Sequence, residues 1–114
     1  MSQDCIFCKV AAGEMGETIY QDEEITAFKD INPQAPTHIL IIPNRHIASV
    51  SAANEAEAEL LGRLLLVAAK VAEEQGIANA GYRLVTNTGA QAGQSVHHLH
   101  FHLLGGRTMN WPPG

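Results

Sequence analysis

Three histidines occupy alternate positions near the end of the chain: His98, His100 and His102. In a β-strand, alternate side chains point to the same face with Cα atoms roughly 6.6 Å apart, so all three imidazoles could act on one substrate or one ion. At neutral pH a histidine is largely uncharged, because its ordinary pKa is about 6.5, and one ring nitrogen is then free to attack, accept a proton or bind a metal. The residues that alternate with them are apolar and could pack on a core. The pattern therefore predicts a reactive strand face.

A second pair of residues with chemical potential is Cys5 and Cys8. Two cysteines separated by two residues, in a reducing compartment, favour metal binding or redox chemistry over a structural disulfide. A tetrahedral zinc site would need two further ligands, which histidines could supply. The alternative is that both are small buried residues of a short helix.

Length and composition limit the kind of protein that carries these residues. The chain has 114 residues, of which 46% are hydrophobic and 17% charged, so we expect one globular domain spanning residues 1–114. A net charge of -5 with scattered Lys and Arg argues against a nucleic acid partner, although backbone N–H groups could still bind a small anion. With neither a signal-peptide pattern nor a run of roughly 20 apolar residues, we expect a cytoplasmic protein without a membrane partner.

Local patterns predict the elements that position the two groups. A short helix is expected over residues 5–12, and a long helix is expected to begin at Asn54, which forms a capping box with Glu57, and to end at a left-handed Gly76. Strands are predicted at 18–21, 25–29, 38–42, 82–87 and 96–104, the last carrying the histidines. Short links favour antiparallel pairing, so the expected fold class is α+β: a mainly antiparallel sheet of about five strands with the long helix packed on it.

Two packing details follow from these elements. The long helix is expected to face the sheet through Leu61, Leu64, Leu65, Ala68, Val71 and Ala72. Strands 82–87 and 96–104 are expected to be neighbours, with Asn87 and Ser95 facing each other across the loop between them. Their side chains and the free N–H groups of the loop would then lie beside the histidine face.

Residues 93–107, Gly-Gln-Ser-Val-His-His-Leu-His-Phe-His-Leu-Leu-Gly-Gly-Arg, resemble the signature of the histidine triad (HIT) superfamily. The ending Gly-Gly-Arg-Thr-Met-Asn-Trp-Pro-Pro-Gly resembles the Hint branch, the histidine triad nucleotide-binding proteins, more than the dinucleoside polyphosphate hydrolases. The last triad residue is His102, whereas Gln would suggest the nucleotidyltransferase branch. The resemblance extends to residues 5–9, 30–38 and 87–89, and so covers nearly the whole chain.

The resemblance implies a homodimer with a HIT-like fold that binds purine nucleoside monophosphates and hydrolyses the P–N bond of nucleoside phosphoramidates without a catalytic cofactor. His100 would attack the α-phosphorus and form a nucleotidyl-histidine intermediate as the amine departs. A backbone carbonyl near His98 would fix the tautomer of His100. His102 would contact the phosphate or the leaving group, and His38 would support the site from the neighbouring strand.

The same resemblance implies the phosphate contacts. Ser95 and the backbone N–H groups of Gly93, Gln94 and Val96 would hold the phosphoryl oxygens, and Asn87 would lie against the same group. Residues at loop ends are also common turn hydrogen-bonders, which is the alternative for Asn87 and Ser95.

The nucleoside contacts are implied in the same way. Asp30 would bind the ribose hydroxyls, although a residue that precedes Ile-Asn-Pro could equally serve only the turn. An apolar slot for the base would comprise Ile6, Phe7, Ile19, Phe28 and Ile31, of which Phe7 and Phe28 could also be plain core residues. Trp111 is expected to approach the active site of the partner subunit, with packing of the C-terminal tail as its alternative role.

Members of the family with two such cysteines can hold a structural zinc, here through Cys5, Cys8, His46 and His98. His97 alternates out of the triad face, so we expect it to be structural or exposed.

Two other functions stay open. One is a metal-dependent hydrolase in which the alternate histidines bind zinc and activate water. The other is a nucleotide-binding adaptor with vestigial catalysis.

Overall fold

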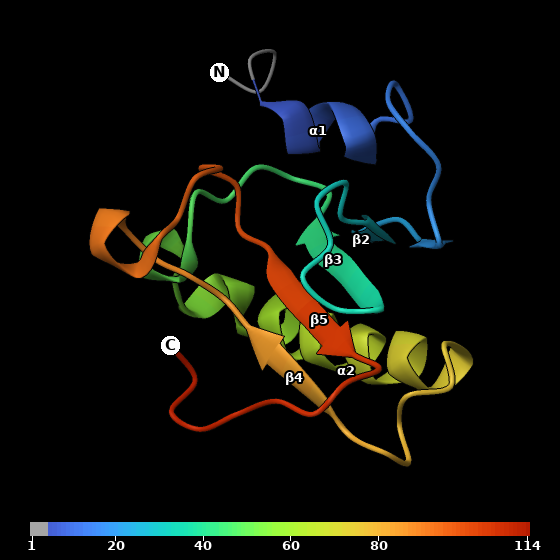
Figure 1. Ribbon diagram of the computed structural model, residues 1–114. Helices are drawn as coiled ribbons and strands as arrows, with labels where there is room; N and C mark the ends of the chain where they lie inside the picture. The colour runs from blue at the N-terminus through green and yellow to red at the C-terminus, as the bar shows by residue number, and fades with distance from the viewer. Residues whose placement is uncertain (1–4) are drawn as a thin grey trace.

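The computed structural model describes residues 5–114, whose core is a five-stranded sheet in the order β1-β2-β3-β5-β4 with every neighbouring pair antiparallel (Figure 1). The strands are β1 Tyr20–Gln21, β2 Ile25–Lys29, β3 Thr37–Pro43, β4 Tyr82–Val85 and β5 Phe101–Gly105. The helices are α1 Ile6–Ala11 and α2 Ala58–Glu74, with short 3-10 turns at Val50–Ala52, Glu55–Glu57 and Ala90–Ala92. The predicted α+β class and its five antiparallel strands are confirmed.

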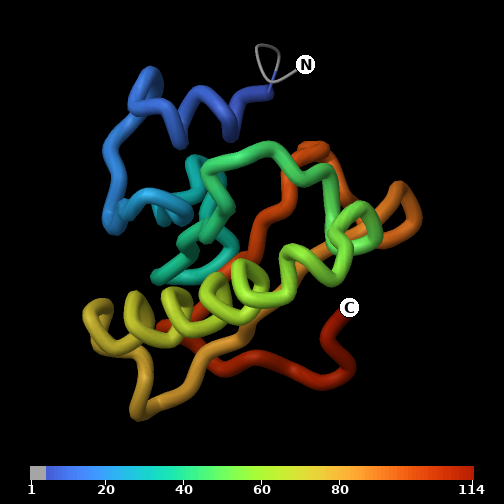
Figure 2. Tube along the Cα trace, turned by 180° about the vertical axis from the view of Figure 1, so that it is seen from behind, coloured from blue at the N-terminus to red at the C-terminus, as the bar shows by residue number. Residues whose placement is uncertain are grey.

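The central strand β3 is buried on both faces. Ile39 and Ile41 belong to the main core, which lies between the sheet and α2, and Figure 2 shows this helix laid across the sheet. Leu40 and Ile42 point the other way and pack in a smaller core with Phe7 of α1. A strand covered on both faces reads as a continuous apolar run, which explains the sequence from 39 to 42.

The predicted capping box at Asn54 is present, but it caps the 3-10 turn Glu55–Glu57, which leads directly into α2 at Ala58. The Asn54 side chain accepts a hydrogen bond from the N–H of Ala56 at 2.9 Å, and the Glu57 carboxylate accepts from the N–H of Asn54 at 2.8 Å. At the other end Gly76 has a φ of 76°, the left-handed conformation expected there.

The buried face of α2 differs in part from the predicted one. Its buried residues are Leu60, Leu64, Val67, Ala68, Val71 and Ala72. Leu61 is half-buried against this core, whereas Leu65 is 46% exposed, so the assignment of Leu65 to the core was wrong. The helix is rotated slightly relative to the prediction, because the stripe through Leu60, Leu64 and Val67 meets the sheet.

The strand that carries the histidines is shorter than predicted. Regular pairing begins only at Phe101, which lies opposite Ile41 of β3, and residues 96–100 are not in the sheet. The next residues of β3 lead to Pro43, which has no N–H to donate, and β4 ends at Val85 opposite His102. The N–H of Leu99 donates instead to the Ile47 carbonyl at 2.6 Å. The alternation survives, since Leu99 and Leu103 lie in the main core.

The predicted strands at 18–21 and 82–87 are also shorter, and the one at 38–42 extends by one residue at each end. Strands β4 and β5 are neighbours, as expected. Across residues 5–114, no helix combines the length and apolar character needed to cross a membrane.

Candidate active site

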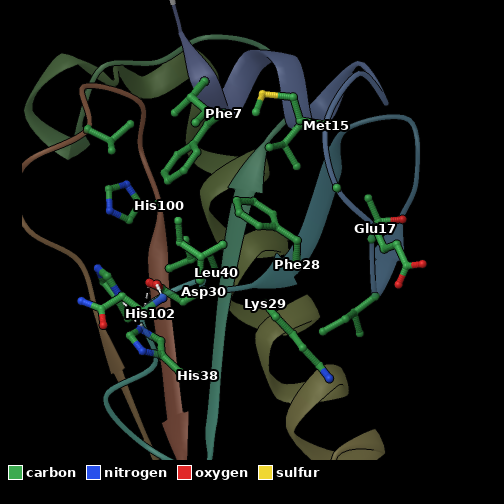
Figure 3. Close-up of a pocket in the computed structure, with 18 of the residues that line it drawn as sticks. Phe7, Met15, Glu17, Phe28, Lys29, Asp30, His38, Leu40, His100 and His102 are labelled. Carbon is green, nitrogen blue, oxygen red and sulfur yellow. Dashed lines mark hydrogen bonds and ion pairs between the residues drawn. The ribbon is translucent and has the colours of Figure 1, made fainter.

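A cavity of about 1020 Å³ opens beside α1, β2, β3 and the segment that leads into β5 (Figure 3). Eleven of the predicted site residues line it: Ile6, Phe7, Ile19, Phe28, Asp30, Ile31, His38, Ser95, Val96, His100 and His102. In Figure 3, Asp30, His38 and His102 lie close together, and His100 lies between them and Phe7. The cavity therefore offers an apolar wall next to a cluster of imidazoles.

Phe7 forms the contact between these two parts. Its ring meets Phe28 edge-on at 5.4 Å and His100 edge-on at 5.0 Å between ring centroids. Val10, one helical turn after Phe7, also lines the cavity, and the spacing of the two residues on a helix was a signal available in the sequence.

The tautomer of His100 is fixed by the backbone. Its Nδ1–H donates to the carbonyl of His98 at 2.7 Å. In the neutral ring Nε2 then carries the lone pair, because only one nitrogen of a neutral imidazole holds a proton. The carbonyl of His100 accepts a hydrogen bond from the hydroxyl of Thr86 at 2.8 Å, a contact that nothing in the sequence indicated.

The proton on His102 can be placed by the same reasoning. The N–H of Gln34 donates to Nδ1 of His38 at 3.0 Å, so the neutral His38 ring carries its proton on Nε2. That Nε2 lies 2.9 Å from Nδ1 of His102 and donates to it. A neutral His102 therefore bears its proton on Nε2, where it is a hydrogen-bond donor.

Burial keeps these rings uncharged near neutral pH. It lowers the pKa of His102 to about 4, and the neighbouring His100 and His38 act in the same direction. Burial also lowers the pKa of His38, and the nearby Asp30 carboxylate opposes that shift. Neutral rings of His38 and His102 are what the hydrogen bond between them requires.

Asp30 makes the hydrogen bond expected of a turn residue and keeps its other carboxylate oxygen at the cavity. One carboxylate oxygen, Oδ1, accepts a hydrogen bond from the N–H of Asn32 at 2.8 Å, which is the turn role. The other, Oδ2, lies 3.4 Å from Nε2 of His38 at the edge of the cavity. The turn therefore orients the carboxylate without occupying both oxygens.

The loop that precedes the histidines differs from the prediction. The N–H groups of Gly93 and Gln94 are already bonded to the carbonyls of Ala90 and Gly89, at 3.0 and 3.1 Å, and neither residue lines the cavity. These two N–H groups are therefore not free for a phosphate. No hydrogen bond within residues 5–114 involves the N–H of Ser95.

Gln94 instead holds the loop together. Its side-chain oxygen accepts from the N–H of Gly89 at 2.9 Å, and its side-chain amide donates to the Ala48 carbonyl at 2.8 Å. Asn87 does not line the cavity, and Trp111 is 82% exposed and lies outside it. Neither Asn87 nor Trp111 therefore lies at the cavity wall.

The cysteine pair meets His98 and His46, and the four possible ligand atoms lie within 4.8 Å of one another. Nδ1 of His98 lies 3.2 Å from Sγ of Cys5 and 3.4 Å from Sγ of Cys8, and Nδ1 of His46 lies 3.4 Å from Sγ of Cys8. Such separations fit a tetrahedral zinc ion with bonds of about 2.0 to 2.3 Å.

The donor chemistry of this group also suits a metal. Nε2–H of His98 donates to the carbonyl of Pro43 at 2.8 Å, so Nδ1 is left with its lone pair toward the thiols. Burial and the neighbouring Cys5 raise the pKa of the Cys8 thiol to about 11, so a bound cation would have to displace its proton. The structure brings His98 to the two cysteines and His46, the set that the resemblance implied, and His98 does not line the cavity.

Comparison with known proteins yields consistent relatives. The family model described as HIT domain matches residues 14–109. Purine nucleoside phosphoramidase of Escherichia coli is 51% identical over 110 residues, which cover 96% of this chain and 92% of the relative. A 14 kDa zinc-binding protein of Zea mays is 53% identical over 112 residues, which cover 96% and 87%. A HIT family hydrolase from Legionella pneumophila superposes with a TM-score of 0.94 at 52% identity, covering 97% of this chain and all of that one.

Proposed function

This chain belongs to the HIT domain family, and on that basis we propose that it is a purine nucleoside phosphoramidase, a hydrolase that cleaves the P–N bond of nucleoside phosphoramidates. The observation that carries the proposal is the tautomer of His100. A backbone carbonyl holds its Nδ1–H at 2.7 Å, so the lone pair of Nε2 is the one available to a substrate in the cavity. The activity of the Escherichia coli relative and its 51% identity support the same function.

In the first step Nε2 of His100 attacks the α-phosphorus, a P–Nε2 bond forms and the bond to the amine breaks. The departing amine nitrogen takes its proton from solvent, and Nε2–H of His102, which the hydrogen-bond chain leaves in place, orients that nitrogen as a hydrogen-bond donor. In the second step water attacks the phosphorus and releases a proton to solvent, the P–Nε2 bond breaks and the mononucleotide is released. Dividing the reaction in this way lets a modest nucleophile act.

The substrate would lie with its base along the apolar wall that contains Phe7 and Phe28. The free edge of the Asp30 carboxylate would accept hydrogen bonds from ribose hydroxyls. Ser95 and the N–H of Val96 would contact phosphoryl oxygens, since both residues line the cavity beside His100.

We propose a structural zinc ion at Cys5, Cys8, His46 and His98. When bound, it would supply a cross-link between α1 and the segments around residues 46 and 98, and no step of the reaction would pass through it. The Zea mays relative, which is named as zinc-binding, supports this assignment.

We also propose that residues 1–114 act as a single HIT domain and that two copies form a homodimer. Strand β4 is the last strand of the sheet, so its outer edge has no partner strand within residues 5–114. Leu65 and Leu66 of α2 are 46% and 72% exposed, which is unusual for large apolar side chains on a helix that has a buried face of its own. A second copy would cover these groups and bring Trp111 toward a neighbouring cavity.

The test of the function is capture of the covalent intermediate. Mixing the protein with adenosine 5'-phosphoramidate and quenching within a turnover should give a mass increase of one nucleotidyl group that maps to His100. His100→Gln should lose both the adduct and turnover while still binding adenosine monophosphate. His97→Gln is the matched control, because His97 is exposed and adjacent in sequence, and it should keep both.

A metal-dependent hydrolase is the second candidate, because Asp30, His38 and His102 also have possible ligand atoms within 4.8 Å of one another. Water activated by a metal would hydrolyse the substrate without forming an adduct. Turnover without any adduct would therefore contradict the proposed mechanism. Nucleotide binding without turnover in the unaltered protein would identify an adaptor instead.

A further inference from the structure

His98 connects the cysteine cluster to the nucleophile. The cluster comprises Cys5, Cys8, His46 and His98. The side chain of His98 is fully buried and held at both nitrogens, with Nδ1 toward the two thiols and Nε2–H on the carbonyl of Pro43. Its own carbonyl accepts Nδ1–H of His100 at 2.7 Å. One residue is therefore part of the cluster through its ring and of the active site through its backbone.

The peptide unit between His98 and Leu99 is hydrogen-bonded through both its carbonyl and its N–H. Its carbonyl accepts from His100, and its N–H donates to the carbonyl of Ile47 at 2.6 Å. Ile47 directly follows His46, which is also a member of the cluster. The cluster thus anchors both chain segments that orient this peptide plane.

A second connection runs through α1. Cys5 precedes this helix and Cys8 lies within it, and Phe7 lies between them with 8% of its surface exposed. The ring of Phe7 contacts His100 edge-on at 5.0 Å and His98 edge-on at 6.1 Å. A helix of six residues has little stability of its own, so its placement depends on what anchors it.

We propose that the cluster of Cys5, Cys8, His46 and His98, with a metal ion bound, is a positioning device for His100. It holds the carbonyl that fixes the tautomer of the nucleophile and the aromatic ring that packs against it. His98 and Phe7 are thereby positioning residues, acting through His100. The inference rests on the proposed function only for the role of His100 as nucleophile; the orientation of its ring can be tested separately.

His46→Ala is the most selective perturbation. His46 is exposed, does not line the cavity and contributes to the cluster, so its removal should weaken metal binding without unfolding the protein or removing a residue of the cavity wall. His97→Ala is the matched control, since His97 is an exposed histidine beside His98 that lies outside the cluster. Circular dichroism should show both variants folded.

Three measurements on the zinc-loaded proteins and on samples dialysed against a chelator test the inference. Zinc content establishes the loading. Two-bond proton–nitrogen NMR spectra of the imidazoles report the tautomer of His100 without any substrate. Steady-state kinetics with adenosine 5'-phosphoramidate separate kcat from KM.

Loss of zinc, by His46→Ala or by chelation, should convert His100 from a single Nδ1–H tautomer into a mixture and lower kcat by about tenfold or more. KM should rise as well, because Phe7 of α1 is also part of the apolar wall, whereas the Asp30 carboxylate keeps its place. His97→Ala should leave the spectrum and kcat unaltered. An unchanged His100 spectrum after zinc loss, or an equal effect of His97→Ala, would overturn the inference. If the unaltered protein hydrolysed no phosphoramidate, the proposed function would fail while the NMR spectra still decided this inference.

Discussion

At the scale of the residue, identical imidazoles acquire different roles because different backbone groups hold their protons. Carbonyl groups accept the Nδ1–H of His100 and the Nε2–H of His98, which exposes opposite ring nitrogens of the two residues. In His38 a backbone N–H donates to Nδ1, so the ring proton lies on Nε2 and His38 donates to His102. The chemistry expected of each histidine follows from one neighbouring peptide group.

The burial of His102 predicts a dependence of stability on pH. Its pKa falls from 6.5 to about 4 on folding, so below pH 6.5 the unfolded chain takes up a proton that the folded chain does not. The free energy of unfolding should therefore decrease as the pH falls from 6.5 to 4, by about 2 kcal/mol once solvent screening is allowed for. The lowered pKa of His38 acts in the same direction.

Urea unfolding of the protein and of His102→Gln at pH 7.0 and pH 4.5 measures this effect. The first pH lies above the ordinary pKa of 6.5, and the second lies close to the lowered pKa of about 4. The variant should lose less stability on acidification than the unaltered protein. Equal losses in the two proteins would show that His102 does not carry the effect.

At the scale of the element, the register of β3 and β5 builds the histidine pair. Leu40 lies opposite His102 and Leu104 lies opposite His38, so the two histidines are diagonal neighbours on one face of adjacent strands. A shift of one residue would turn either histidine into the core beneath α2. The apolar residues that alternate with the histidines therefore maintain the site, because they hold the register.

The capping box of α2 gives a prediction at this scale. Asn54→Ala removes the hydrogen bond to the N–H of Ala56 and should lower the free energy of unfolding by about 1 kcal/mol. Asn79→Ala, in the exposed turn after the helix, should change it by less than about 0.5 kcal/mol. Thermal and urea unfolding of both variants compare them. Similar losses would argue against a specific contribution from the cap.

At the scale of the whole molecule, a single copy leaves two surfaces uncovered. The sheet ends at β4 with its outer edge unpaired within the described chain, and α2 exposes two adjacent leucines. Arg83 of β4 donates to the carbonyl of Asn110 at 2.8 Å and holds the segment that leads to the exposed Trp111. A second copy could cover these surfaces together.

Leu66→Glu tests the homodimer. A charge at a leucine that is 72% exposed in one copy should cost little in a monomer but should disrupt an apolar interface. Analytical ultracentrifugation should show a dimer for the unaltered protein and a shift toward monomer for the variant. Met15→Glu, at a residue 41% exposed on the rim of the cavity, is the control and should stay dimeric. A monomeric unaltered protein would contradict the proposal.

The sequence by itself determined the local features of this protein. The capping residues of α2, the left-handed Gly76 and the twice-buried β3 follow from patterns that act within a few residues, because backbone dihedral angles and side-chain faces are local properties. The same holds for the alternation that separates the histidines from Leu99 and Leu103. The residues of the candidate site came from the resemblance, and their roles stay predictions.

The resemblance implied how the three alternate histidines are divided, and only the tertiary structure shows the contacts that divide them. Cys5 and His98 are 93 positions apart in the chain, and their contact depends on where α1 packs. The end of regular pairing at Phe101, the satisfied N–H groups of Gly93 and Gln94, and the proton on each ring likewise depend on segments that meet only after folding. Spacing in the sequence placed the imidazoles on one side of the chain, but contacts between distant residues assigned His98 to the cysteines and left His100 and His102 to the cavity.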